Sequence, residues 1–313
     1  MIVTRRPEPG RVSVIVAGDG PPEGLRRALL SVAGQSHAST EILCVDTSPS
    51  GSARDAVEAV SGGALHLALP GGGLAEARNA GVERSSGQFV AFMDPGDVWE
   101  PGKLERQVLL MRENRDVGLV FSRAWLEAAG RTTAIHPRPG AAWESLFDRG
   151  VGVDDPAALY ARILLEEIVP VSTVLARRVS LPTEGPFRAG RSPHEDHDFI
   201  LRISEIGRFA FVDDPLVTTP MRPARRDASA AAAALAIFRD NVARNPWLLQ
   251  RDPRGMRGRE LDLLRETGLS LVREGRGREA RPVLAEAWRR NLMDLRLPAI
   301  LLASLSSARR PRA

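Results

Sequence analysis

The chain has 313 residues, of which 43% are hydrophobic and 26% are charged, as is typical of a globular protein with one large domain or two smaller ones. Its formal net charge is only +4, and no basic stripe interleaved with aromatic residues occurs, which argues against nucleic-acid binding. The single cysteine excludes a disulfide within the chain and fits a reducing compartment. No apolar run reaches the length of about 18 residues that a membrane span needs, and the start does not resemble a signal peptide. These features predict a cytoplasmic protein.

Strands and helices alternate through the first part of the chain. Short apolar runs predict strands at residues 12–17, 41–46, 64–69, 88–93 and 117–121. Apolar residues at helical spacing predict helices at residues 23–34, 52–60, 74–84 and 101–113. This alternation predicts an α/β fold whose mostly parallel sheet is flanked by helices.

The middle of the chain is less regular. Residues 171–175 are predicted to form a strand, and residues 195–206 a helix. Two short strands are expected at residues 209–212 and 216–219. The turn-rich segment 182–193 is interpreted as a mobile loop.

Composition changes after Arg222, and helices are expected at residues 225–244, 257–274, 278–291 and 294–306. We therefore predict a domain at residues 1–224 and a helical extension at residues 225–313. The last segment, residues 297–313, is apolar and then basic. A final packing helix is favoured there over weak peripheral contact with a membrane surface.

The first predicted strand is followed by a glycine-rich turn that allows two interpretations. Gly18, Gly20 and Gly24, with Asp46 at the end of the next strand, approach the pattern of a dinucleotide-binding site. However, prolines 21–22 remove two backbone N–H groups that would donate to a phosphate. A glycine turn without a ligand is therefore favoured over a nicotinamide or flavin site.

Three stretches in order carry a more specific resemblance. They are VSVIVAGDGPPEGLRRALLSVAGQSHASTEILCVDTS from residue 12, AEARNAGVERSSGQFVAFMDPGDVWEPGKL from residue 75, and EDHDFILRISEIGRFAFVDDPLV from residue 195. Together they resemble the inverting family 2 glycosyltransferases, which have the GT-A fold, and the resemblance covers residues 11–222. It implies transfer of a sugar from a nucleotide-sugar donor to the hydroxyl of an acceptor, which is a small molecule, a lipid-linked glycan or another glycan.

The resemblance implies a set of residues that bind the donor. Asp46 would accept hydrogen bonds from the nucleobase or ribose, and the alternative is an acid that caps a loop. Arg78 would lie beside the base or diphosphate, where a guanidinium is suited to bind. Asp94 would bind the ribose. The aromatic turn that many relatives place after the first strand is absent, and Asp19 is a candidate donor contact there.

Asp94-Pro95-Gly96-Asp97 stands where the family carries its metal-binding Asp-x-Asp-Asp run. The resemblance implies Mg²⁺ or Mn²⁺ bound through oxygen ligands and bridging the diphosphate. Gly96 replaces a usual ligand, so three outcomes stay open: Asp97 takes its place, Asp94 binds the metal together with waters, or the metal is lost.

Glu195 and Asp196 match the acidic pair of the family, in which the aspartate is the general base that deprotonates the acceptor. The resemblance thus implies Asp196 as base, Glu195 in support and Asp198 as a substitute. Acids in the first turn of a helix are also common because they interact favourably with the helix dipole. His197 beside them is expected to be exposed unless it tunes the pair or binds metal.

Two other functions remain open. The incomplete metal motif and the missing aromatic turn are compatible with a catalytically impaired GT-A scaffold that binds nucleotide or a protein partner. Nucleotidyl transfer on a related α/β fold fits less well, because the acids near residue 195 suit a base for an acceptor. We expect acceptor specificity to lie in residues 130–193 and in the helical extension.

Overall fold

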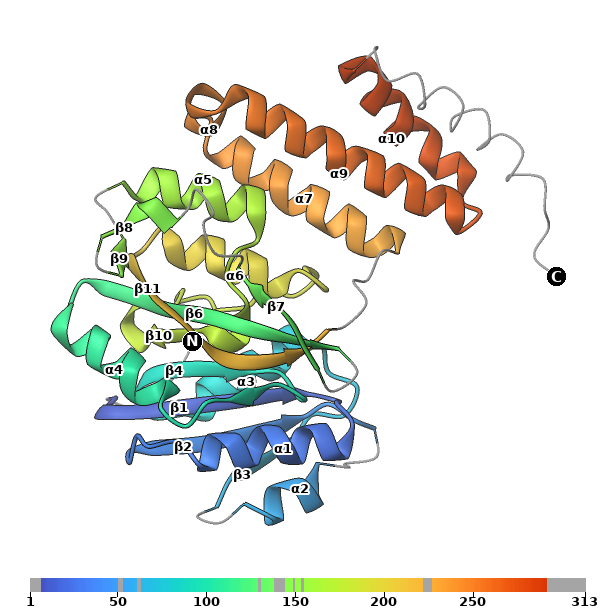
Figure 1. Cartoon of the computed structure of the whole chain (residues 1–313). Helices are drawn as coiled ribbons and strands as arrows, with labels where there is room; N and C mark the ends of the chain where they lie inside the picture. The colour runs from blue at the N-terminus through green and yellow to red at the C-terminus, as the bar shows by residue number, and fades with distance from the viewer. Residues whose placement is uncertain are drawn as a thin grey trace. The chain divides into compact units, whose positions relative to one another are not determined.

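The computed structural model describes residues 7–49, 53–60, 63–128, 131–137, 144–148, 150–152, 155–221 and 227–291. The chain divides into two compact units (Figure 1). The first contains residues 1–190 and 195–222, and the second contains residues 191–194 and 223–313. The division in the chain after residue 222 lies close to the expected boundary at residue 224.

The first unit is built on a mixed sheet, which confirms the α/β fold. Its strands are hydrogen-bonded in the order β3-β2-β1-β4-β10-β6-β11-β9-β8, with β5 paired to β11 and β7 paired to β6. The bounds are β1 Glu8–Gly18, β2 Thr40–Asp46, β3 Leu65–Ala68, β4 Gly87–Met93, β5 Val98–Trp99, β6 Val117–Ala128, β7 Arg131–His136, β8 Phe147–Asp148, β9 Val151–Gly152, β10 Leu175–Arg177 and β11 Arg208–Pro220. Strands β3, β2, β1 and β4 run parallel to one another, whereas β10 is antiparallel to both of its neighbours.

Helices cover both faces of this sheet (Figure 1). Val12, Val14 and Val16 alternate to one face of β1, where they share a core with residues of α1 (Pro22–Ala33), α2 (Arg54–Glu58) and α4 (Lys103–Glu113). Ile15 points to the other face and meets α3 (Leu74–Arg84). Phe92 of β4 also lies on that face, with its ring 5.5 Å from the Phe199 ring of α6 (Glu195–Ser204). The face with α3 and α6 therefore brings together the arginine and the acids singled out in the sequence.

Close packing of α3 depends on a glycine. A Cβ atom at Gly81 would lie 2.5 Å from Cγ2 of Ile15, closer than side-chain carbons approach. Because Gly81 lacks this atom, α3 lies directly on β1, and Ala77 and Arg78 of the same helix are buried. The position of Arg78 is thus fixed by a helix that cannot move outward without losing this contact.

The structure corrects three expectations for the middle of the chain. Residues 171–173 form a 3-10 turn, η2 (Val171–Thr173), and the strand begins only at Leu175. The two short strands expected near residues 209–219 are one strand, β11, because a register shift at Asp213–Pro215 lets pairing with β6 continue. A helix that the sequence analysis missed, α5 (Pro156–Glu166), begins where the Asp155 side chain accepts from the Ala158 N–H.

Beyond residues 191–194, the second unit is helical where it is described. Its helices are α7 (Ala228–Arg244), α8 (Trp247–Arg251), α9 (Pro253–Arg273) and α10 (Gly277–Arg290) (Figure 1). The helix expected at residues 294–306 and the basic tail lie outside the described residues. In the described part of the chain, no helix is long and apolar enough to cross a membrane.

Candidate active site

A pocket of about 420 Å³ lies at the carboxyl ends of β1, β2 and β4. In open α/β sheets, ligands bind at this edge. The register of the parallel strands places Gly18 beside Asp46 and Asp46 beside Ala68, so the three loops after these strands meet. We call this the first pocket; its lining includes Gly18, Asp19, Gly20, Thr47, Gly71, Gly72, Leu74 and Asp94.

Asp46 stands beside the first pocket but does not line it. Its side chain is 2% exposed. Oδ1 accepts from the N–H of Ser48 at 2.9 Å and Oδ2 from the N–H of Ala53 at 3.1 Å. Burial raises the pKa of Asp46, but hydrogen bonds from the Ser48 side chain, from these two N–H groups and from His66 outweigh it and hold the pKa below its ordinary value. The geometry is that of an acid capping its own loop, and the next residue, Thr47, is the one that reaches the pocket.

Arg78 joins two groups of acids beneath the pocket. Its side chain is 2% exposed; Nη2 donates to Oδ1 of Asp94 at 2.8 Å, and Nη1 lies 3.9 Å from Oε1 of Glu195. The guanidinium carbon lies 5.0 Å from the centre of the Phe187 ring. Burial lowers the pKa of Arg78, but the charges of Asp94, Asp196 and Glu195 outweigh it and raise the pKa above its ordinary value.

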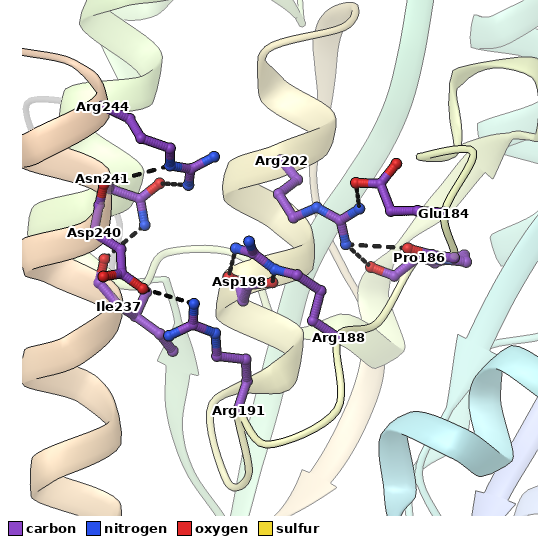
Figure 2. A network of polar contacts seen from close by, with 11 residues as sticks. Glu184, Pro186, Arg188, Arg191, Asp198, Arg202, Ile237, Asp240, Asn241 and Arg244 are labelled. Atoms are coloured by element: carbon purple, nitrogen blue, oxygen red, sulfur yellow. Dashed lines mark hydrogen bonds and ion pairs between the residues drawn. The ribbon is translucent and has the colours of Figure 1, made fainter.

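The loop that carries Phe187 is held on both sides. The Asn79 amide donates to the carbonyl of Phe187 at 2.6 Å and accepts from its N–H at 3.0 Å. Arg202 of α6 donates to the carbonyls of Gly185 and Pro186 and pairs with Glu184 (Figure 2). The segment expected to be a mobile loop is therefore anchored at residues 184–187, directly beside Arg78.

Asp94 and Asp97 differ in whether their side chains are accessible to a cation in the first pocket. Asp94 lines the first pocket and its side chain is 24% exposed. Asp97 is 2% exposed and does not line the pocket. Among the described residues, no cluster of three or more acids, histidines or cysteines could hold a metal by itself. Mg²⁺ is commonly held by one or two carboxylates together with substrate phosphates, and Asp94 fits that arrangement whereas Asp97 does not.

Two acids begin α6. Glu195 is 3% exposed, and burial raises its pKa above the ordinary value. Asp196 is partly exposed. Loss of water around it raises its pKa and the charge of Asp94 adds to this, although Arg78 opposes the shift. A raised pKa near other acids suits a group that takes up a proton.

Asp198 is placed differently from Asp196. It is 1% exposed, and Nε of Arg188 donates to its Oδ2 at 2.8 Å while Nη2 of Arg188 bonds the other oxygen (Figure 2). Both oxygens are thus occupied by one guanidinium. Asp198 holds the loop before α6, and this geometry does not support it as a substitute base.

A second pocket, of about 240 Å³, is lined by Asp196. His197 lines it too, rather than standing exposed. Its other lining residues are Ala124, Leu126, His136, Glu167, Val169, Pro170 and Thr219. Four of these residues come from the irregular range 130–193, in which acceptor specificity was expected. Glu167 was not singled out in the sequence; it ends α5 with a left-handed φ of 47°.

Part of the chain matches a known protein family. Residues 13–155 match the model of "Glycosyl transferase family 2". The resemblance to family 2 glycosyltransferases is confirmed. The chain is 32% identical over 105 residues to the beta-1,3-glucosyltransferase WfgD of Escherichia coli, a match that covers 33% of this chain and 42% of that protein. It spans 35% to 42% of the length of the first curated relatives that it matches.

Solved structures show the same fold. TarS of S. aureus in complex with UDP-GlcNAc has a TM-score of 0.61 at 14% identity, covering 95% of this chain and 91% of that chain. The mannosyltransferase PcManGT of Pyrobaculum calidifontis, in complex with GDP-Man and Mn²⁺, has a TM-score of 0.56 at 17% identity, covering 95% of this chain and 86% of that one. The GT-A fold is therefore confirmed.

Proposed function

We propose that the chain is a glycosyltransferase that moves a sugar from a nucleoside diphosphate in the first pocket to an acceptor hydroxyl in the second, with inversion at the sugar carbon. One observation carries this proposal. Arg78 pairs with Asp94, which lines the first pocket, and lies beside Glu195, whose neighbour Asp196 lines the second. Two cavities that share one charged cluster suit a reaction between two substrates.

Asp196 is the proposed general base. Its carboxylate takes the proton of the acceptor hydroxyl while the hydroxyl oxygen attacks the sugar carbon, and the bond to the diphosphate breaks on the opposite side. One displacement of this kind inverts the configuration at that carbon. Withdrawal from water and the charge of Asp94 raise the proton affinity of Asp196, and Arg78 limits the rise.

The donor is proposed to lie along the glycine-rich wall of the first pocket. Gly71, with a φ of 72°, and Gly72 let a ligand approach the backbone closely. Asp19 and Thr47 supply side-chain oxygens at the rim for the nucleoside, and Asp46 fixes the loop that carries Thr47. The proteins crystallised as TarS and PcManGT bind UDP-GlcNAc and GDP-Man, so UDP-sugars and GDP-sugars are the first donors to test.

Mg²⁺ or Mn²⁺ is proposed to accompany the donor, with Asp94 as its protein ligand. Such a cation would neutralise the charge of the leaving diphosphate. Two described carboxylates line the pocket, and because Asp19 is proposed to contact the nucleoside, the remaining metal ligands would be phosphate oxygens and water.

Nucleotide release from a panel of UDP-, GDP- and dTDP-sugars tests the activity, and NMR of the product tests the inversion. Asp196→Asn is expected to lower kcat roughly 10²–10⁴-fold while nucleotide binding persists, because only the base is lost. Glu205→Gln is the matched control, since Glu205 is exposed just past the other end of α6. Unchanged turnover in Asp196→Asn would remove Asp196 from this role. Release of no nucleotide by the wild type, with binding retained, would favour the impaired scaffold instead.

A further inference from the structure

Lys103, the only lysine of the chain, is fully buried at the start of α4. Its Nζ donates to Oε1 of Gln107 at 2.9 Å and lies 3.8 Å from the centre of the Trp99 ring. Burial lowers its pKa well below the ordinary value, and no described carboxylate offsets this shift. A buried lysine without a counter-ion is unfavourable for stability, so its presence calls for another explanation.

The two residues that hold Lys103 also hold η2. Nε1 of Trp99 donates to the carbonyl of Ser172 at 3.0 Å, and Nε2 of Gln107 donates to the carbonyl of Thr173 at 2.7 Å. Trp99 and Gln107 are themselves buried. The amino group of Lys103 orients both side chains, because it lies against the ring of one and donates to the amide oxygen of the other. Its donation to Oε1 leaves Nε2 of Gln107 free to donate to η2.

Through η2 this network reaches both pockets. Oγ of Ser172 accepts from the N–H of Asp94 at 3.1 Å, and Asp94 lines the first pocket. Pro170, immediately before η2, lines the second pocket, and its carbonyl accepts from Oγ1 of Thr173 at 2.6 Å. The same three-residue turn therefore sets the backbone of Asp94 and one wall of the pocket that contains Asp196.

We infer that Lys103, Trp99 and Gln107 are positioning residues. They hold η2 so that the donor and acceptor pockets keep the relative position that transfer requires. The inference rests on the proposed function. None of the three lines either pocket. Their effect passes through the carbonyls of η2. Transfer between two bound substrates is sensitive to displacements of about 1 Å, whereas binding in each pocket is less so. Loss of the network therefore lowers kcat more than it weakens donor binding.

Lys103→Met tests this inference, because methionine keeps about the length of the side chain but removes its hydrogen-bond donor. We expect kcat to fall roughly tenfold or more while the donor KM changes less than about threefold. Val108→Ala is the matched control: it truncates a buried side chain of the same helix in the main core. Activities are compared at a temperature where circular dichroism shows both variants folded. Equal kcat in Lys103→Met and Val108→Ala would overturn the inference.

Ser172→Ala provides a second variant if Lys103→Met does not fold. It removes only the oxygen that accepts from the Asp94 N–H, and the same loss of kcat is expected. Unchanged kcat in Ser172→Ala would also overturn the inference.

Hydrogen exchange separates this inference from the proposed function. The amide hydrogens of Asp94 and of residues 168–175 should exchange faster in Lys103→Met than in Val108→Ala. If Ser172→Ala replaces Lys103→Met, the same comparison applies to it. This measurement needs no known donor. Equal exchange in the tested variant and Val108→Ala contradicts the positioning network. Inactive wild-type protein contradicts only the proposed function.

Discussion

At the scale of single residues, the ionised forms of the two acids that begin α6 are unfavourable in the folded chain. Glu195 and Asp196 both have raised pKa values, chiefly because they are withdrawn from water. A carboxyl whose pKa is higher in the folded chain than in the unfolded chain binds its proton more tightly when folded. Its stabilising contribution is therefore complete below the unfolded pKa and is lost as the pH rises through the folded pKa.

Asp196→Asn is accordingly expected to raise the Tm at neutral pH while it lowers turnover. The neutral amide removes a charge that the folded state disfavours. The gain in Tm over the wild type should shrink as the pH falls through the raised folded pKa of Asp196 and be gone below the unfolded pKa of an aspartate, about 4. Thermal unfolding across that pH range measures it. A lower Tm for Asp196→Asn at neutral pH would show that the charge is stabilising in the folded chain.

The pH dependence of turnover follows from the same shift. Because the base must be deprotonated, kcat/KM should rise with pH through a value above the ordinary aspartate pKa of about 4 and then level off. Initial rates under limiting donor and acceptor measure this profile. A profile that is already level near that ordinary value would contradict the raised pKa of Asp196.

Residue types in sequence predicted part of this site. The contacts of Arg78 and the exposure of Asp94 agree with the expected donor edge, and the roles themselves stay predictions. The sequence could not show that Asp46 turns inward to its own loop, because an acid at the end of a strand either caps the loop or meets a ligand. Thr47 and Glu167 carry no pattern in sequence that marks them as pocket residues.

At the scale of elements, the sequence predicted the order of strands and helices in the first half of the chain. The spacing of apolar residues in each element reflects the face that the element buries. The missed helix α5 had a signal, Asp155 before Pro156, which is a helix cap followed by proline in the first turn. β11 was expected as two strands because Asp213 and Pro215 usually end a strand, and only pairing with β6 carries it through. Long-range pairing of this kind is not visible in local composition.

Gly81→Ala is expected to lower stability by about 1–3 kcal/mol and also to reduce activity, because the added carbon pushes α3 from β1 and moves Arg78. Chemical denaturation and nucleotide release measure the two effects. Gly258→Ala in α9 is the control: nothing lies within 4 Å of its added carbon, so a gain of about 0.4–1 kcal/mol is expected. Wild-type stability in Gly81→Ala would show that α3 does not need this close contact.

At the scale of the whole molecule, the chain joins a glycosyltransferase fold to a set of helices whose role stays open. Within the helical unit, Arg239 and Arg290 each pair with Glu260 and Glu286, which ties α7, α9 and α10 together. These ion pairs link the helices of that unit and do not indicate its function. The expected boundary at residue 224 lies among residues outside the description, and the cytoplasmic location also stays a prediction.

Calorimetric titration of the wild type and Asp94→Asn with UDP, GDP and dTDP, each with and without Mn²⁺, tests the central claim most directly. The claim is that the first pocket binds a nucleoside diphosphate with Asp94 as the one protein carboxylate facing its cation. We predict that one nucleotide binds the wild type, that Mn²⁺ strengthens this binding, and that the Mn²⁺ effect is lost in Asp94→Asn. Binding of none of the three nucleotides to folded wild-type protein would contradict the account.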